Sequence, residues 1–301
     1  MENGNVLLNK SNARININIK AYYQLAKPGI IRGNLFAAIG GFMYASGRNI
    51  DWMLGLDVIV GTALIIGSAC VLNNVLDVKI DSKMRRTKQR AMVTGEISRK
   101  NAFIFASVLG VIGYAILLLF TNLIAFWLGV IALATYVVVY TPLKKRSYIA
   151  TFVGAVPGAI PPLAAYCSVR DVIDLPALLI FLNMFFWQLP HFFAISIFRK
   201  DEYKKADVPV LSIVKGDELT KKVIIIGIVA FMLITPVLYI TDHATVSYLL
   251  GCLVLSGYWL FRALQFLPKV DSVRWARKMF GVSLMVLSLY STLLALNTFL
   301  P

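Results

Sequence analysis

Long runs of apolar residues, separated by polar segments, dominate the pattern of this chain. About 20 consecutive apolar residues are enough for a helix to cross the hydrocarbon core of a bilayer. A soluble core would instead alternate apolar and polar positions. We therefore predict nine transmembrane helices. They are expected near residues 29–47, 54–76, 102–120, 123–141, 149–167, 176–197, 223–241, 246–267 and 279–299.

The predicted fold is an all-α polytopic membrane protein. Its two long polar segments follow the second and sixth spans, which indicates two four-helix units plus a ninth helix. We expect a cytoplasmic N-terminal segment over residues 1–28 and a single transmembrane domain over 29–301. The short stretch Thr121-Asn122-Leu123 joins the third and fourth spans and predicts a tight antiparallel hairpin. Three prolines, Pro157, Pro161 and Pro162, predict a kink or break in the fifth span.

The distribution of basic residues predicts the orientation of the chain. Of its 30 Lys and Arg, all but Arg48 and Arg170 fall on one set of loops. The positive-inside rule places that set in the cytoplasm, with the amino terminus inside and the carboxyl terminus outside. Topology and anionic lipid thus account for the net charge of +15, and we expect no nucleic-acid partner.

The composition supports a membrane protein and excludes several kinds of site. The chain is 58% hydrophobic and 15% charged, whereas soluble domains average about a quarter charged residues. The three cysteines each lie inside an apolar run without a partner at metal-ligand spacing. They are interpreted as packing residues and not as zinc ligands or disulfides.

The polar segment after the second span carries a row of oxygen-bearing side chains. Asn73, Asp77 and Asp81 are four residues apart and share one face of a helix, and Arg85 is expected to continue that row. Such ligands suit Mg²⁺, which takes one or two carboxylates together with substrate phosphate. The neighbouring cations suit the oxygens of a diphosphate. The alternative is a solvated helix end whose charges pair with one another.

The polar segment after the sixth span again places acidic residues just beyond a membrane helix. It carries Asp201, Glu202, Tyr203 and Lys204. Two facing acidic helix ends would each hold a metal ion on a shared diphosphate. This second segment lacks a regular Asp-x₃-Asp pair.

The sixth span itself contains a histidine in apolar surroundings. His191 follows Trp187 and Gln188 within one turn. Ionisable residues inside membrane helices are costly and are more often functional than in soluble cores. His191 is a candidate to bind iron, to orient a propionate, or to hydrogen-bond a neighbouring helix.

Several short segments along nearly the whole chain form a recognisable set. They are Lys27-Pro-Gly-Ile30, the row Asn73-x₃-Asp77-x₃-Asp81-x₃-Arg85-x-Thr87-x₂-Arg90, Tyr140-Thr-Pro-Leu-Lys144-Lys-Arg146, the stretch 154–162, Trp187-Gln-x-Pro-His191, Phe198-Arg199-x₂-Glu202-Tyr203, Pro209-x-Leu211 and Trp275-Ala-Arg277. Together they resemble the protoheme IX farnesyltransferases, the bacterial heme O synthases, within the UbiA-type intramembrane prenyltransferase superfamily. The Asn/Asp row is typical of the superfamily, and the Trp-Gln-x-Pro-His stretch of heme farnesylation.

The resemblance implies that 29–301 is a prenyltransferase domain in the bacterial inner membrane, with catalytic loops on the cytoplasmic side. Farnesyl diphosphate and heme B would give heme O and diphosphate, with water added to the former vinyl group. Heme O would serve a terminal heme-copper oxidase, so oxidase-assembly or heme-handling proteins are expected partners besides the lipid bilayer. Mg²⁺ is the expected cofactor, and heme B is a substrate.

The resemblance also assigns roles to residues of this chain. It implies one metal ion at Asn73, Asp77 and Asp81, and a second at Asp201 and Glu202. His191, Trp187 and Gln188 are the expected heme contacts. The residues expected to hold the diphosphate or to act close to it are Arg85, Lys88, Arg90, Tyr203 and Lys204.

Two other functions stay open at this point. Prenylation of an aromatic quinone precursor would use the same Asn/Asp row. A small-solute transporter would fit duplicated helical units and a proline-rich fifth span. A transporter, however, is expected to place its charges near the midplane of the bilayer, whereas here they lie at the cytoplasmic ends of helices.

Overall fold

The computed structural model describes residues 18–266 and 271–301. Within these residues all regular structure is helical and no strand occurs, as predicted. Most of the N-terminal segment predicted over 1–28 lies outside the described residues. Its last part forms α1 (Ile19–Leu25), a short helix capped by the side chain of Asn18.

Nine long helices make up the body of the described chain. They are α2 (Pro28–Ser46), α3 (Trp52–Asp81), α5 (Arg99–Phe120), α6 (Leu123–Ala134), α8 (Ala150–Arg170), α9 (Leu175–Phe198), α12 (Gly216–Ile234), α14 (Val246–Phe266) and α15 (Ser272–Leu296). The short elements are α4 (Ala91–Thr94), the π-helix η1 (Thr135–Tyr140), α7 (Thr141–Leu143), α10 (Lys200–Lys205), α11 (Leu211–Val214), α13 (Val237–Ile240) and the 3₁₀ turn η2 (Asn297–Phe299).

Eight helices of the described residues are long and apolar enough to cross a membrane. The first predicted span, α2, is not among them, because Arg32 and Asn34 lower its hydropathy. It is nevertheless 19 residues long and packs against α8 and α15. Eight of the nine predicted spans are therefore confirmed as helices suited to a membrane.

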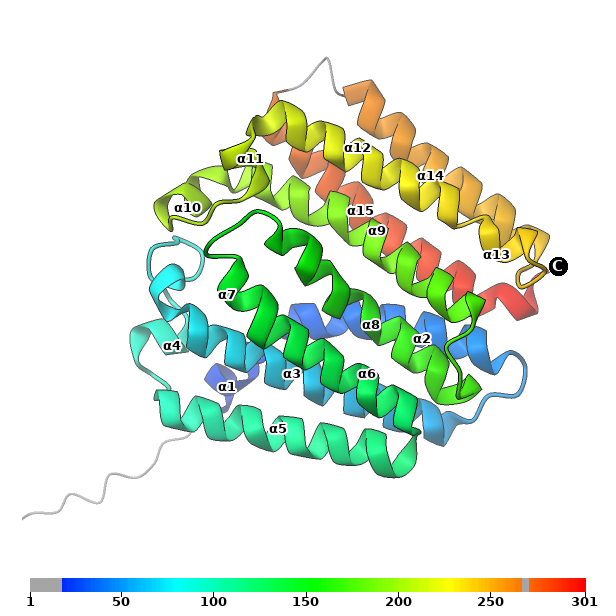
Figure 1. The fold of residues 1–301 in the computed structure, drawn as a ribbon, viewed down its shortest axis with the longest axis horizontal. Coiled ribbons are helices and arrows are strands. Elements are labelled where there is room, and N and C mark those ends of the chain that lie inside the picture. The colour runs from blue at the N-terminus through cyan, green and yellow to red at the C-terminus, as the bar shows by residue number, and fades with distance from the viewer. Residues whose placement is uncertain (1–17, 267–270) are drawn as a thin grey trace, which may run out of the picture.

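Helices that follow one another in the chain pack together, and α8 joins the two halves by packing against α2 and α6. In the first half α2 contacts α3, α3 contacts α5, and α5 contacts α6. In the second half α8 contacts α9, α9 contacts α12, and α12 contacts α14, while α15 packs against α2, α9 and α14. Figure 1 shows α4, α10 and α11 together at one end of the bundle and the carboxyl terminus at the other. Loops far apart in sequence thus meet at one end.

Small residues allow α2 to approach its neighbours closely. A Cβ atom at Gly41 would lie 2.3 Å from the carbonyl oxygen of Pro162 in α8, and one at Gly40 would lie 2.9 Å from that of Ser291 in α15. Small residues at helix interfaces let membrane helices associate through backbone contact. This packing seats α2 beside α8 and α15 although α2 is less apolar than the other long helices.

The helix that contains the three prolines does not break. α8 runs without interruption from Ala150 to Arg170, with Pro157, Pro161 and Pro162 inside it. Proline removes a backbone donor, but in membrane helices packing against neighbours compensates. α8 is enclosed by α2, α6 and α9, and all three prolines are buried or partly buried. The predicted break is therefore wrong, and the alternative, a kink, stays a prediction. The predicted hairpin between the third and fourth spans is present, since α5 ends at Phe120 and α6 begins at Leu123.

Candidate active site

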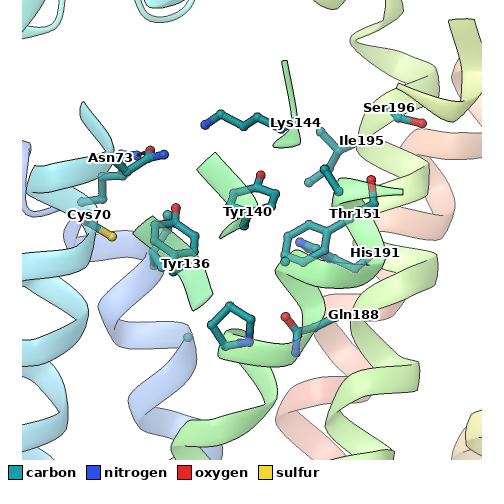
Figure 2. Close-up of a pocket in the computed structure, with 18 of the residues that line it drawn as sticks. Cys70, Asn73, Tyr136, Tyr140, Lys144, Thr151, Gln188, His191, Ile195 and Ser196 are labelled. Atoms are coloured by element: carbon teal, nitrogen blue, oxygen red, sulfur yellow. Dashed lines mark hydrogen bonds between the residues drawn. The ribbon is translucent and has the colours of Figure 1, made fainter. Parts of the chain in front are cut away.

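A cavity of about 800 Å³ opens among α2, α3, η1, α8, α9 and α15. Figure 2 shows Asn73 and Cys70 of α3 on one side of it and His191 and Gln188 of α9 on the other, with Tyr136 and Tyr140 between them. Charged residues line the part at the ends of the helices, and apolar residues line the rest. The cavity thus joins a charged end to an apolar chamber.

The polar row on α3 is a feature of one helical face, as predicted. Helix α3 extends to Asp81, five residues beyond the predicted span, so that Asn73, Asp77 and Asp81 all lie on it and are 2–5% exposed. The Nζ of Lys27 donates to Oδ1 of Asn73 at 2.7 Å, and Nδ2 of Asn73 donates to Oγ1 of Thr141 at 3.0 Å. The row is therefore fixed by partners that are distant in sequence.

Each carboxylate of the row is paired with a cation from another segment. Lys144 bonds to Oδ2 of Asp77, and Arg90 donates to Oδ2 of Asp81 at 2.6 Å. Arg90 also donates to Oδ1 of Asn74 at 3.0 Å. The other oxygen of Asp77, Oδ1, is buried without a hydrogen-bond partner among the described residues. A buried, unpaired carboxylate oxygen is costly unless a ligand satisfies it.

The charged end carries an excess of positive charge. Only two carboxylates, Asp77 and Asp81, line the cavity in the described chain. Against them stand six cations: Lys27, Arg86, Arg90, Lys144, Arg199 and Arg277. Such an excess suits an anion with several negative charges.

The pKa values of two of these cations are lowered by burial and, to a smaller extent, by the neighbouring cations. Burial lowers the pKa of Lys27 to about 8, and the nearby charges of Arg90 and Lys144 act in the same direction. The pKa of the Arg86 guanidinium is also lowered, first by burial and then by Arg90 and Arg199. A bound anion would relieve the repulsion and favour the charged forms.

The donor set fits a metal ion that takes part of its coordination from a substrate. Among the described residues no three His, Cys, Asp or Glu gather closely enough to hold an ion by themselves. The row instead offers the free oxygen of Asp77, a second carboxylate and an amide oxygen. Mg²⁺ is usually bound by one or two carboxylates plus substrate phosphates.

The prediction that Arg85 continues the row is wrong. Helix α3 ends at Asp81, and residues 82–90 form turns, so the spacing of four no longer keeps one face beyond that point. Arg85, Arg86 and Lys88 are all exposed, but only Arg86 lines the cavity. A sequence pattern cannot identify the inward-facing arginine where the helix gives way to a turn.

The second acidic segment lies at the rim of the cavity. Of its predicted site residues, Tyr203 lines the cavity, while Asp201, Glu202 and Lys204 do not. Asp201 and Lys204 are exposed. Nearby, Asp207 pairs with Lys83 at 2.5 Å, at the solvent-exposed surface.

Glu202 holds two arginine-bearing segments together. It accepts a hydrogen bond from Nη1 of Arg199 at 2.8 Å and one from the backbone N–H of Arg86 at 3.4 Å. Both arginines line the cavity. Spacing along the sequence gives neither arginine a role, because only the folded chain brings the turn after α3 to the end of α9.

A π-helix forms the wall between α3 and α9. In η1 the rings of Tyr136 and Tyr140 stack at 5.2 Å, and Nζ of Lys144 lies 5.3 Å from the ring centre of Tyr140. A Cβ at Gly154 would lie 2.7 Å from the Tyr140 ring, so this glycine makes room for it. π-helical turns are frequent at functional sites, and periodicity did not predict this one.

The three residues predicted as heme contacts all line the apolar chamber. Trp187 and His191 stack with ring centres 5.0 Å apart, and His191 also lies 4.7 Å from the ring of Phe280. Gln188 is buried and donates to the carbonyl of Ala155 at 3.3 Å. Aromatic rings therefore enclose the imidazole on the α9–α15 side.

Ser283 of α15, which the sequence analysis missed, positions this group. Its hydroxyl donates to the carbonyl of Phe280 at 2.7 Å and lies 2.8 Å from Nδ1 of His191. When the single hydroxyl proton is directed at Phe280, Oγ can accept from Nδ1–H, and that tautomer leaves the lone pair on Nε2. No described residue hydrogen-bonds to Nε2. The backbone carbonyl of Ser283 accepts from Nε1 of Trp187 at 2.7 Å.

Comparison with known proteins assigns this chain to one family. The model of the UbiA prenyltransferase family matches residues 34–289. A curated protein of Pectobacterium carotovorum named protoheme IX farnesyltransferase is 41% identical over 285 residues, which cover 94% of this chain and 96% of that protein.

Solved structures show the same fold at low sequence identity. A digeranylgeranylglyceryl phosphate synthase superposes with a TM-score of 0.77 at 19% identity, covering 93% of this chain and 98% of that one. A UbiA homolog from Archaeoglobus fulgidus bound to GPP and Mg²⁺ gives a TM-score of 0.68 at 13% identity, covering 91% and 99%. The helical arrangement is thus that of intramembrane prenyltransferases.

Proposed function

This chain belongs to the UbiA prenyltransferase family, and we propose that it transfers a farnesyl group from farnesyl diphosphate to the vinyl group of heme B. The products are heme O and diphosphate, with water added to the former vinyl group. The 41% identity to a protoheme IX farnesyltransferase over nearly the full length of both chains supports this substrate pair.

One observation carries the proposal: a single cavity joins an anion-binding end to an apolar chamber that contains a histidine. The charged end matches a diphosphate, and the chamber matches an isoprenoid chain and a flat macrocycle. A volume of about 800 Å³ lies in the upper part of the range usual for ligand sites. A transporter site would be expected near the bilayer midplane, whereas these charges lie where the helices end.

We assign the row on α3 to the metal and diphosphate. Asn73, Asp77 and Asp81 would hold Mg²⁺, and the unpaired Oδ1 of Asp77 supports this assignment. The A. fulgidus homolog was solved with Mg²⁺ and GPP together. When bound, Mg²⁺ supplies positive charge that stabilises the diphosphate leaving group. A second ion at Asp201 and Glu202 stays a prediction.

The cations of the charged end would bind the diphosphate oxygens. Lys27, Arg86, Arg90 and Lys144 line this end, and three of them already contact the amide or carboxylates of the row. The bond between C1 of the farnesyl group and the diphosphate oxygen breaks, and its electron pair leaves with the diphosphate. Preorganised cations lower the energy of that charge separation.

The apolar chamber would then protect the allylic cation. The stacked faces of Tyr136 and Tyr140 lie between the two walls and suit a carbocation through cation–π attraction. The vinyl group of heme B attacks C1, and hydroxide from water adds to the remaining vinyl carbon while its proton is released. Apolar walls delay capture by water until the carbon–carbon bond has formed.

Topology and setting complete the proposal. We infer nine spans, α2 included, in two units of four plus one, with the amino terminus and the charged loops in the cytoplasm of a bacterial inner membrane. The prenyltransferase domain would cover residues 29–301. Heme O would pass to a terminal heme-copper oxidase, with heme-handling or oxidase-assembly proteins as partners.

The test is a reconstituted reaction. Heme B, farnesyl diphosphate and Mg²⁺ are added to purified protein in lipid nanodiscs. The porphyrin products are then separated, and their masses are measured by mass spectrometry. We expect a product with the mass of heme O, and we expect it to form only when heme B, farnesyl diphosphate and Mg²⁺ are all present. A parallel reaction contains an aromatic carboxylic acid in place of heme. Prenylation of the acid with unaltered heme would overturn the proposal in favour of a quinone pathway.

A further inference from the structure

Arg277, like Arg86, has no hydrogen bond or ion pair from its guanidinium to the described residues, unlike the other cations of the cavity. Lys27, Arg90, Lys144 and Arg199 each bond to an amide or carboxylate of the described residues. No acidic side chain of the described residues pairs with Arg277, although it lines the same cavity. Its guanidinium is exposed and available to a ligand.

Arg277 lies on the wall opposite the metal row. It belongs to α15, which packs against α9, and Figure 2 shows α9 across the cavity from α3. Phe280, one turn further along α15, contacts both Phe198 at 5.5 Å and His191 at 4.7 Å. The cation therefore stands on the wall that holds the histidine.

The spacing along α15 relates Arg277 to that histidine. Ser283, which hydrogen-bonds to His191, lies six residues after Arg277, or roughly 9 Å along the helix axis. Arg277, Phe280, Leu284 and Leu287 all line the cavity at helical spacing. From the charged end inward, the wall thus offers a guanidinium, an aromatic ring with the imidazole, and aliphatic side chains.

We propose that Arg277 binds a propionate carboxylate of the heme substrate and so sets which edge of the macrocycle faces the cytoplasmic end of the cavity. This inference rests on the proposed function. It adds an anchor for the polar edge of the macrocycle on the α15 wall, opposite the row on α3, and leaves the vinyl edge free to meet C1 of the farnesyl group.

The groups of the macrocycle correspond to the side chains of this wall. Its iron lies at the centre, its faces are apolar, and its two carboxylates lie on one edge. The carboxylate edge would lie toward Arg277 and the iron toward His191, whose partner Ser283 is six residues further along α15. A planar guanidinium forms two parallel hydrogen bonds to a carboxylate, which fixes orientation as well as position.

Two other ligands for Arg277 fit the observations less well. The diphosphate already has four cations around the row on α3, across the cavity. A lipid headgroup would suit a cation on the outer surface of the bundle, but Arg277 lines the cavity. Arg274, one turn before it, is exposed, pairs with Asp271 at 3.2 Å and does not line the cavity. It is the matched control.

The experiment measures heme binding to the full chain in nanodiscs by absorption titration. We expect Arg277→Gln to raise the Kd for heme B at least about tenfold, the size of one lost charge-assisted contact. The Kd of Arg277→Lys for heme B should lie between those of the wild type and Arg277→Gln, because lysine keeps the charge but cannot form two parallel hydrogen bonds to one carboxylate. Arg274→Gln should bind heme as the wild type does, and the KM for farnesyl diphosphate should stay constant in all three variants.

Heme B dimethyl ester, whose propionates carry no charge, provides the decisive second ligand. The wild type should bind the ester more weakly than heme B, and Arg277→Gln should bind the two alike. Equal affinity of the wild type and Arg277→Gln for heme B would overturn the proposal, as would an effect on farnesyl diphosphate alone. If the wild type still makes heme O in those cases, the proposed function stands and only the anchor is wrong. Failure of the wild type to bind or modify heme would overturn both.

Discussion

Removing the hydroxyl of Ser283 isolates the group that we expect to meet the heme iron. Oγ of Ser283 lies 2.8 Å from Nδ1 of His191 and donates to the carbonyl of Phe280 at 2.7 Å. The contact of Trp187 runs to the backbone carbonyl of Ser283, so it survives Ser283→Ala. The substitution therefore deletes the contact with His191 and the hydrogen bond to the carbonyl of Phe280, and leaves the stacked Trp187–His191 pair in place.

The expected loss follows from the role of the contact with His191. It fixes the tautomer that keeps the lone pair on Nε2, and neutral imidazole is a good ligand for iron. Outer partners of metal-bound histidines typically contribute 10- to 100-fold in affinity. We therefore expect Ser283→Ala to raise the Kd for heme B about 10-fold. His191→Ala should raise it further and change the spectrum of the bound heme, because the ligand itself is lost.

The assay is an absorption titration of the protein in nanodiscs with heme B, together with binding of farnesyl diphosphate as a control. Ser283→Thr, which keeps a hydroxyl, should retain most of the affinity. In the His191→Ala background, Ser283→Ala should have no further effect, since the two residues act as one unit. Additive effects of the two substitutions, or an unchanged heme spectrum in His191→Ala, would show that the imidazole packs helices and does not bind iron.

Three further predictions test the metal site, the topology and the packing. Asp77→Ala should lower turnover at least ~10²-fold without loss of membrane insertion, and chelation of divalent ions should abolish turnover in the wild type; substantial activity after either change would refute the metal assignment. Reporter fusions should behave as cytoplasmic at Lys145 and as periplasmic at Asp242, and the reverse pattern would contradict the predicted orientation of the chain in the membrane. Gly41→Ala places a Cβ 2.3 Å from a backbone carbonyl of α8 and should destabilise the fold by roughly 1–3 kcal/mol, measured by thermal unfolding. Gly257→Ala, where nothing lies within 4 Å, should not, and equal melting of the two variants would contradict the close approach of α2.

The sequence by itself determined the features that depend on local pattern. Apolar runs of about 20 residues located every long helix, and most of the predicted helix ends lie within a few residues of the observed ones. The spacing of Asn73, Asp77 and Asp81 identified one face of one helix, and α3 does carry that face. A repeat in hydrophobicity or spacing is a property of consecutive residues, so it can be interpreted without knowing what packs against them.

Predictions from helical spacing and from proline content were wrong where neighbouring segments changed the local structure. Beyond Asp81 the chain turns, so the inward-facing cation is Arg86 and not Arg85. The prolines of α8 do not interrupt it, because α2, α6 and α9 enclose that helix. In both cases the sequence pattern was correct for an isolated helix, and neighbouring segments changed the result.

Only the tertiary structure decided which side chains meet in the cavity. Lys144 reaches Asp77 from 67 residues away, and Ser283 reaches His191 from 92 residues away. Glu202 joins the segments of Arg86 and Arg199. These contacts depend on how whole helices pack, and packing is set by small residues and shape at many interfaces at once. No spacing within one segment encodes such a pair, so the tautomer of His191 and the separate position of Arg277 become visible only in the folded bundle.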